Sequence, residues 1–349
     1  MRLLCRELAR EPGVVNRLIT RRRSELARRL QAPSGQDAEG LVAVTEVGWA
    51  FSLDPRAYRQ IVFYLLTAQP DIVHAHDSHA LTLSMLAART AERWRRRGFF
   101  RKLASDYQAP AIVATRRVDF HLRRWSAWRR VDRIIAISAA VRSVLIDDGI
   151  SPRGVTVVAD GINPEEVRGA EPLNVRARLG LSGETPLAVN VAALVDHKDQ
   201  RTLIRAAQRA RATRPDLHWA IAGEGELRGS LTAEIARLGL ADRVHLLGYV
   251  DPADALIREA DVFVMSSKEE GLGSVILNAL ALGKPVVATA AGGIPEILPA
   301  TALVPVGDAA ALAQKVVDTL EHPSPVPLPP QFTSSAMAQG VLAVYRSLV

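Results

Sequence analysis

The sequence predicts an α/β protein made of two doubly wound domains with parallel sheets. The chain has 349 residues, more than one ordinary core requires, and this length suits two domains of about 150 residues or more. Short apolar strand patterns alternate with helical patterns in both halves, which is typical of a parallel sheet covered by helices. The turn Asp-Gly-Ile-Asn-Pro at residues 160–164 interrupts the alternation. We therefore place the domain boundary near residue 163.

Composition narrows the class of protein further. Apolar residues make up 48% of the chain and charged residues 23%, as in a globular protein and unlike a disordered or fibrous one. Cys5 is the single cysteine, so an internal disulfide is excluded and a reducing compartment is expected. No apolar run reaches the ~18 residues that span a bilayer, and the N-terminus carries no signal-peptide pattern. We expect a cytoplasmic protein, with the inner face of the cytoplasmic membrane as a candidate location.

Positive charge is concentrated in the first half of the chain. Residues 1–160 hold 27 Lys and Arg against 16 Asp and Glu, although the net charge of the whole chain is only +7. This asymmetry indicates either an anionic partner or a solvated, arginine-rich surface. An anionic membrane and a lipid-linked acceptor are candidate partners. Nucleic acid is not expected, because no recognition-helix or aromatic stacking pattern accompanies the basic residues.

In the first half, apolar periodicity predicts the elements in order. We expect helices over residues 2–11, 24–30, 55–68, 78–97 and 138–148, and strands over residues 14–20, 41–45, 71–74, 111–115, 132–137 and 155–158. Ser24, Ser78 and Ser138 are predicted N-caps. A doubly wound domain normally opens on a strand and a glycine turn, so the first strand of this domain is expected to be missing or to lie upstream.

Polar residues follow two of these strands, at the edge where open α/β sheets bind ligands. His74 and His76 would point to opposite faces if their strand continued, so we do not expect a metal site there. His76 and Asp77 are predicted either to hydrogen-bond a ligand or to make structural contacts at the strand end. Arg117 follows the next strand and either holds an anionic group or pairs with Asp119.

The second half restarts the alternation, with strands expected over residues 187–193, 217–222, 243–247, 261–265 and 285–289. Glu270 and the turn Gly271-Leu-Gly273 follow the fourth of these strands and precede a helical pattern over residues 274–282. Backbone N–H groups at a helix N-terminus can bind a phosphate, and a carboxylate suits sugar hydroxyls. The alternative is an ordinary turn whose glycines only make room. A proline-rich linker is expected after Glu321, followed by a last helix over residues 333–348.

The stretch from residue 270 to residue 296 resembles the donor signature of family 4 of the retaining glycosyltransferases. Glu270 matches its first acidic residue, and residues 279–287 match its later apolar part, followed by Gly292, Gly293 and Glu296. Asn278 stands where the family has a second acidic residue.

One further position extends the resemblance and two depart from it. Lys198 matches the family lysine that holds the donor diphosphate, whereas Ala193 stands where a companion arginine is expected. Arg117 occupies a position where a histidine is frequent. The resemblance covers nearly the whole chain, because the motifs occur in the family's order.

The resemblance implies the GT-B fold, in which two Rossmann-like domains face a cleft. Residues 1–163 would form the acceptor side, with the helix at residues 333–349 packing back on it, and residues 164–330 would bind the nucleotide sugar. The implied reaction is the transfer of a hexosyl group, with retention, to a glycan or lipid-linked acceptor in surface polysaccharide, lipopolysaccharide or glycolipid assembly. No metal or other cofactor is implied. A sugar-nucleotide 2-epimerase and a degenerate, inactive donor-binding protein are the alternatives.

The resemblance also assigns roles to individual residues. Glu270 and Lys198 would be catalytic: Lys198 would bind the departing diphosphate, and Glu270 would orient the sugar. The acceptor side would include His76, Asp77 and Arg117. The residues that would contact the donor are Gly271, Leu272, Gly273, Ser274, Asn278, His197 and Gly248.

Overall fold

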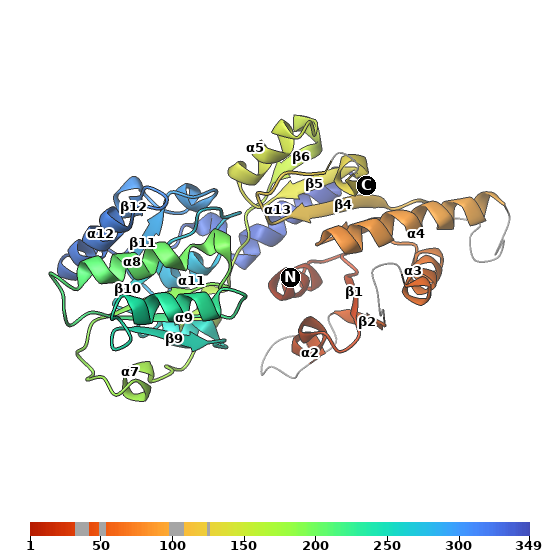
Figure 1. Cartoon of the computed structure of the whole chain (residues 1–349). Coiled ribbons are helices and arrows are strands. Elements are labelled where there is room, and N and C mark those ends of the chain that lie inside the picture. Colours follow the sequence, from red (N-terminus) through yellow and green to blue (C-terminus); the bar gives the residue numbers. More distant parts are fainter. Residues whose placement is uncertain (32–41, 49–53, 98–107, 124–125) are drawn as a thin grey trace. The chain divides into compact units, whose positions relative to one another are not determined.

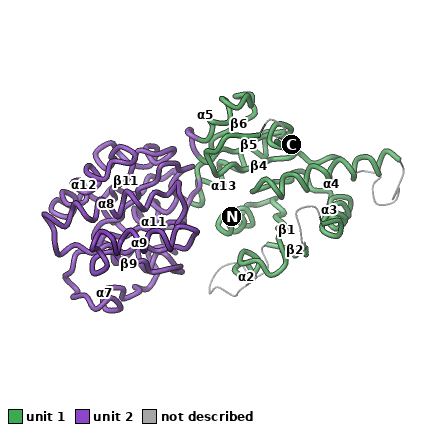
Figure 2. The backbone as a smooth tube through the Cα atoms, viewed as in Figure 1, with its two compact units in different colours: residues 1–137, 141–159, 334–349 green, residues 138–140, 160–333 purple. Residues whose placement is uncertain are grey.

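The computed structural model describes residues 1–31, 42–48, 54–97, 108–123 and 126–349, which form two compact units (Figure 2). Unit 1 comprises Met1–Ile137, Val141–Ala159 and Ser334–Val349, and unit 2 comprises Ser138–Ala140 and Asp160–Thr333. The chain passes from unit 1 to unit 2 after Ala159, whereas the sequence placed the boundary near residue 163. The assignment of one domain to the acceptor and the other to the donor stays a prediction.

Unit 1 is built on parallel strands (Figure 1). A four-stranded sheet has the order β3-β4-β5-β6, and β1 pairs in parallel with β2 in a separate two-stranded sheet. The strands are β1 (Arg17–Arg21), β2 (Ala43–Val47), β3 (Ile72–Ala75), β4 (Ala111–Arg116), β5 (Arg133–Ala136) and β6 (Val155–Val157). Parallel pairing throughout this sheet confirms the predicted α/β class for the first half.

The first and last helices of the chain share a core within unit 1. The helices of this unit are α1 (Arg2–Ala9), α2 (Glu25–Gln31), α3 (Pro55–Ala68), α4 (Ser78–Arg96), α5 (Ala139–Asp147) and α13 (Ser334–Arg346), although the first two residues of α5 are grouped with unit 2. Leu4 and Leu8 of α1 belong to one buried apolar cluster with Met337 and Val341 of α13 and Val113 of β4. This burial of apolar surface holds the C-terminal helix on the first unit.

A short polar side chain caps the start of α2, as predicted, whereas the predicted cap of α4 needs a correction. The Ser24 hydroxyl accepts a hydrogen bond from Ala27 N at 3.1 Å. At the start of α4, however, the cap is Asp77 and not Ser78, because Asp77 Oδ1 accepts from Ala80 N at 2.7 Å. A carboxylate at this place also interacts favourably with the positive end of the helix dipole.

Unit 2 contains a six-stranded parallel sheet with the order β12-β11-β10-β7-β8-β9 (Figure 1). The strands are β7 (Leu187–Val191), β8 (His218–Ala222), β9 (Val244–Gly248), β10 (Val262–Met265), β11 (Val286–Thr289) and β12 (Leu303–Val304). The alternation predicted for the second half is therefore confirmed. The crossover from β9 to β10 places β10 beside β7, which determines what meets at the sheet edge.

Helices cover this sheet and bury its apolar side chains. They are α6 (Pro164–Arg168), α7 (Val175–Arg178), α8 (Gln200–Ala210), α9 (Arg228–Arg237), α10 (Ala253–Ile257), α11 (Val275–Ala281) and α12 (Ala309–Glu321). Leu203 of α8, Leu231 of α9 and Leu312 of α12 share a core with Trp219 of β8. After Gly293 the chain forms a single 3₁₀ turn, Ile294–Glu296.

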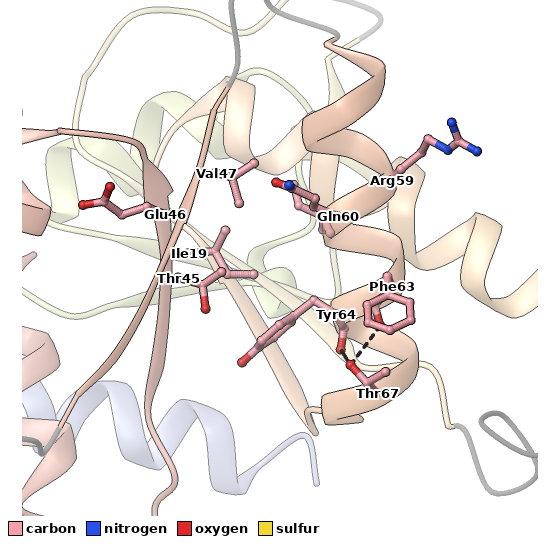
Figure 3. A pocket seen from close by; sticks show the side chains of 10 residues that line it. Ile19, Thr45, Glu46, Val47, Arg59, Gln60, Phe63, Tyr64 and Thr67 are labelled. Atoms are coloured by element: carbon pink, nitrogen blue, oxygen red, sulfur yellow. Dashed lines mark hydrogen bonds between the residues drawn. The ribbon is translucent and has the colours of Figure 1, made fainter.

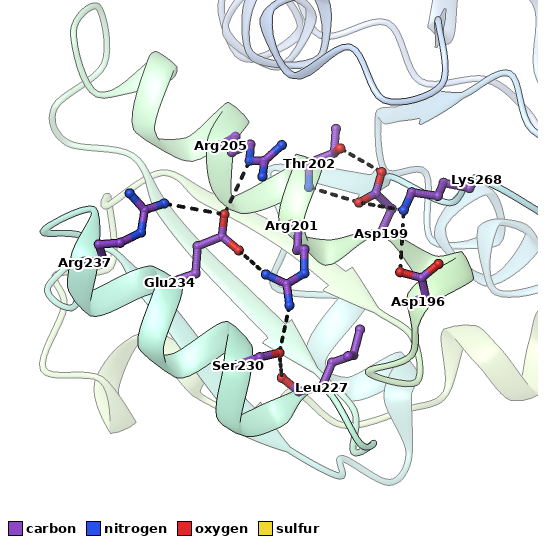
Figure 4. Close-up of polar contacts among 10 residues, drawn as sticks. All are labelled: Asp196, Asp199, Arg201, Thr202, Arg205, Leu227, Ser230, Glu234, Arg237 and Lys268. Carbon is purple, nitrogen blue, oxygen red and sulfur yellow. Dashed lines mark hydrogen bonds and ion pairs between the residues drawn. The ribbon is translucent and has the colours of Figure 1, made fainter.

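Polar contacts fix the start of α8, which directly follows Lys198 (Figure 4). Asp199 caps the helix, since its carboxylate accepts from Thr202 N at 3.3 Å and from Thr202 Oγ1 at 2.7 Å. Farther along, the buried Glu234 of α9 accepts from Arg201 at 2.9 Å and from Arg205 at 3.4 Å, both on α8. These charge-assisted bonds hold α8, the helix that begins shortly after Lys198, against α9.

Candidate functional site

The sheet order of unit 2 brings two predicted motifs together. Lys198 ends a 3₁₀ turn, Asp196–Lys198, in the loop after β7, and Glu270 lies in the loop after β10. Because β7 and β10 are hydrogen-bonded neighbours, their carboxyl ends meet at one edge. The loops are bonded to each other: Lys268 N donates to His197 O at 2.8 Å, and Ser266 Oγ donates to Lys198 O at 3.1 Å.

Lys198 and Glu270, the two predicted catalytic residues, form an ion pair. Lys198 Nζ donates directly to Glu270 Oε2, and the two side chains are 17% and 12% exposed. The Ser267 hydroxyl donates to the same carboxylate oxygen at 3.3 Å. A cation and a carboxylate therefore stand side by side, partly shielded from solvent, where charge interactions are stronger than at an open surface. The ammonium has three N–H donors, so it can hold Glu270 and an added anion together.

Glycines permit the backbone to pack closely behind Glu270. Gly273 has φ +81°, in the region that favours glycine, and a Cβ atom at Gly292 would lie 1.8 Å from Glu270 O. Leu272 is buried, and the chain from Gly271 leads through Ser274 to α11. The helix predicted over residues 274–282 is confirmed but short, since it covers only Val275–Ala281.

Asn278 is engaged by a carboxylate that the sequence analysis did not single out. Its Nδ2 donates to Asp254 Oδ1 at 2.5 Å, joining α11 to α10. Burial raises the pKa of Asp254 above its usual value, Asn278 opposes that shift, and Glu166 and Asp251 add to it. No local pattern could have indicated Asp254, because it lies 24 positions from Asn278.

The remaining predicted donor residues lie at the same sheet edge, at different distances from the ion pair. His197 adjoins Lys198 and accepts from the Lys268 backbone, as described above. Gly248 ends β9, which is separated from β10 by β7 and β8, so it lies about 14 Å along the sheet from the end of β10. Its φ is +77°, and a Cβ atom there would lie 2.9 Å from Glu224 Oε1.

In unit 1, the structure brings the predicted residues His76 and Arg117 together, and His74 joins them. The His74 and His76 rings are 4.0 Å apart between centroids, so the expectation that they point to opposite faces is wrong. The reason is that side chains two positions apart point to the same face of a strand, so the alternation along β3 (Ile72–Ala75) itself places His76 beside His74. His74 Nδ1 is hydrogen-bonded to the Tyr345 hydroxyl at 2.6 Å, and His74 Nε2 is hydrogen-bonded to the Thr115 hydroxyl at 2.7 Å.

Both imidazoles are held neutral by their surroundings. Burial lowers the pKa of His74 to about 3, and the positive charge of Arg117 contributes. Burial also lowers the pKa of His76 well below its usual value, with His74 and Arg117 adding to the effect. At neutral pH the guanidinium is therefore the charged member of this group. Asp77, the third predicted acceptor-side residue, caps α4.

A separate hollow of about 430 Å³ lies in unit 1 between β1, β2 and α3 (Figure 3). Ile19, Val47 and Tyr64 are among its lining residues. None of the predicted site residues lines it, so the candidate site does not include it.

The described part of the chain holds no group of three or more His, Cys, Asp and Glu side chains arranged for a metal ion. The expectation that no metal is needed stays a prediction.

Among the described residues, no helix combines the length and the apolar character that crossing a membrane requires.

The family of this chain follows from comparison with known proteins. Residues 1–166 match the family model described as Glycosyltransferase Family 4, and residues 185–322 match the model described as Glycosyl transferases group 1. The chain belongs to this family of glycosyltransferases, and its two Rossmann-like units are those of the GT-B fold.

Individual relatives agree with this assignment. The putative glycosyltransferase EpsD of Bacillus subtilis is 29% identical over 276 residues, which cover 76% of this chain and 71% of EpsD. LpsE of Rhizobium meliloti, a lipopolysaccharide core biosynthesis glycosyltransferase, is 31% identical over 170 residues, which cover 49% of this chain and 47% of LpsE. The chain thus spans about half the length of LpsE.

A solved structure is similar over nearly the whole chain. The crystal structure of Anabaena HepE in complex with UDP matches with a TM-score of 0.76 at 19% identity, covering 99% of this chain and 96% of that chain. At this level of identity, the likeness shows the fold.

Proposed function

We propose that the protein transfers a sugar, with retention of the anomeric configuration, from a nucleotide-sugar donor to an acceptor hydroxyl. The observation that supports this most is the Lys198–Glu270 ion pair at the carboxyl edge of the sheet in unit 2. Two residues that the sequence placed 72 positions apart stand together, next to the Gly271–Gly273 turn. This pairing suits a ligand that carries both phosphate and hydroxyl groups.

The chemistry of the pair suits a departing diphosphate. Negative charge develops on the leaving oxygen, and the Lys198 ammonium would stabilise it together with backbone N–H groups near Gly273 and Ser274. Glu270 would accept hydrogen bonds from sugar hydroxyls and fix the ring orientation. His197 and Gly248 would border the rest of the donor. Asn278 would contact the ribose through its amide, since no acidic residue stands at that position.

The acceptor would be bound by unit 1. Neutral His76 can donate or accept a hydrogen bond, and Arg117 can hold a phosphate or carboxylate of an acceptor. With 27 Lys and Arg against 16 Asp and Glu in residues 1–160, an anionic, lipid-linked acceptor at a membrane surface is the chemical class that we favour. The name of LpsE supports a role in assembling cell-envelope glycans.

Nucleotide binding and product analysis test this proposal. Calorimetry with UDP, GDP and ADP would identify the base, and UDP is the first choice because HepE contains it. Mass spectrometry of mixtures with nucleotide sugars would then detect transfer or hydrolysis, and NMR of the product would report its anomeric configuration. An epimerised nucleotide sugar would instead indicate a 2-epimerase. Tight nucleotide binding without any turnover of a broad donor panel would indicate an inactive donor-binding protein.

A further inference from the structure

The loop that carries Glu270 is held from behind by two segments that are distant in sequence. Gly293 N donates to Glu270 O at 2.9 Å. Ser138 Oγ donates to Gly271 O at 2.6 Å, and the Ser138 side chain is fully buried. Ser138, Gly271 and Gly293 all belong to unit 2. Two consecutive carbonyl groups, those of residues 270 and 271, are thus fixed by donors outside their own loop.

The close approach of these segments leaves no room for adjustment. A Cβ atom at Gly293 would lie 2.4 Å from Gly271 O and 3.0 Å from Ser138 Cβ. Both distances are shorter than ordinary van der Waals contact, so only glycine at position 293 allows Ser138 and Gly271 to pack this closely against it.

Glu296 fixes Ser138 in turn. Its carboxylate accepts from Ala139 N at 2.8 Å through one oxygen and from Ala140 N at 2.9 Å through the other. These two N–H groups are the first of α5, where an anionic acceptor is favoured by the helix dipole. Glu296 ends the 3₁₀ turn that follows Gly293. Glu296 thus holds the segment that carries Ser138, and Ser138 holds Gly271. Gly293, three positions before Glu296, holds the adjacent Glu270.

We propose that Ser138 and Glu296 are positioning residues, which hold the Glu270–Gly271 loop in the geometry that meets Lys198. This inference rests on the proposed function, because it concerns the same donor site. Neither residue needs to contact the donor. Loss of the Ser138 hydroxyl would leave Gly271 O buried without this donor, and the loop would relax at the expense of the ion pair.

The test compares the full-length wild type with the variants Ser138→Ala and Glu296→Gln. Hydrogen–deuterium exchange of the peptide covering residues 268–275 is measured first, and calorimetry with UDP follows. We expect Ser138→Ala to speed exchange in this peptide and to weaken UDP binding about tenfold. Glu296→Gln keeps one acceptor oxygen and should give a smaller effect in the same direction. It also keeps the test decisive if Ser138→Ala does not fold.

The matched control is Ser334→Ala. Ser334 is also buried, and its hydroxyl donates to Glu7 Oε1 at 2.8 Å in unit 1. This variant should leave both exchange in residues 268–275 and UDP binding unchanged. Wild-type exchange and UDP affinity in Ser138→Ala and Glu296→Gln would overturn the inference. If the wild type binds no nucleotide, the proposed function fails, and the exchange data alone still decide whether these residues position the loop.

Discussion

Asn278 and Asp254 are joined by a hydrogen bond of 2.5 Å from the amide of one to the carboxylate of the other. The position at which the resembled family carries an acidic residue is therefore adjacent to a carboxylate supplied by α10. An amide suits this place because it can donate, whereas a second carboxylate could only accept.

Restoring the family residue by Asn278→Glu should consequently destabilise the protein. Two carboxylates would face each other and the hydrogen bond would be lost, which we expect to lower the free energy of unfolding by about 1 to 3 kcal/mol. Urea denaturation at neutral pH measures this. The double variant Asn278→Glu with Asp254→Asn restores a donor opposite an acceptor and should recover much of the loss. An Asn278→Glu single variant as stable as the wild type would contradict the interpretation.

Removal of either member of the Lys198–Glu270 pair should strongly reduce sugar transfer. We expect Lys198→Ala and Glu270→Ala each to lower kcat by about 10²- to 10³-fold, as for loss of a group that stabilises developing charge. Circular dichroism should show an intact fold in both. The control is Lys268→Ala. The Lys268 side chain is 42% exposed, and its Nζ lies 3.6 Å from Asp196 Oδ1 and 3.8 Å from Asp199 Oδ1. Wild-type rates in both site variants would remove the site assignment.

Metal removal should leave transfer unaffected. The proposed mechanism assigns neutralisation of the diphosphate to Lys198 and backbone N–H groups, so no divalent cation takes part. Initial rates would be compared after dialysis against EDTA and after addition of Mg²⁺ or Mn²⁺. A rate that vanishes with EDTA and returns with a metal ion would refute this part of the mechanism.

The free energy of unfolding should fall as the pH is lowered below about 6.5. The reason is that His74 binds a proton near this pH when the chain is unfolded but stays neutral when the chain is folded. The pKa of His74 is about 3 in the folded protein, below its ordinary value of 6.5. The contribution of His74 to the free energy of unfolding is therefore fully present above pH 6.5 and is lost as the pH falls toward 3. We expect a slope near 1 kcal/mol per pH unit from this residue. Urea denaturation between pH 7.5 and pH 5 should show a smaller slope in His74→Gln than in the wild type, with the exposed His322→Gln as the control.

Packing of α13 within unit 1 should depend on Gly340. A Cβ atom there would lie 2.7 Å from Val158 Cγ1, and the branched valine has little freedom to turn away. We expect Gly340→Ala to lower the free energy of unfolding by about 1 to 3 kcal/mol, because the added methyl group overpacks this site. Gly229→Ala is the matched control, since it also lies in a helix but has nothing within 4 Å of the added atom. It should stabilise slightly, because alanine favours the helix. Equal melting shifts for the two variants would argue against the clash.

The sequence alone determined the class of the fold and the local elements. The helix expected over residues 55–68 is α3 (Pro55–Ala68), and the strand patterns near residues 111 and 262 are β4 and β10. These elements depend on the spacing of apolar residues and on nearby caps, which are local properties of the chain. The order of the motifs likewise indicated the family, because each motif is a short contiguous stretch.

Only the tertiary structure decided which of these stretches meet. Lys198 reaches Glu270 because the strand order places β10 beside β7. The periodicity of a single segment does not determine the strand order of the sheet. The bonds from Asn278 to Asp254 and from Ser138 to Gly271 join residues 24 and 133 positions apart. Such pairs form when separate helices and loops pack together, and their partners are set by the three-dimensional arrangement of buried surfaces.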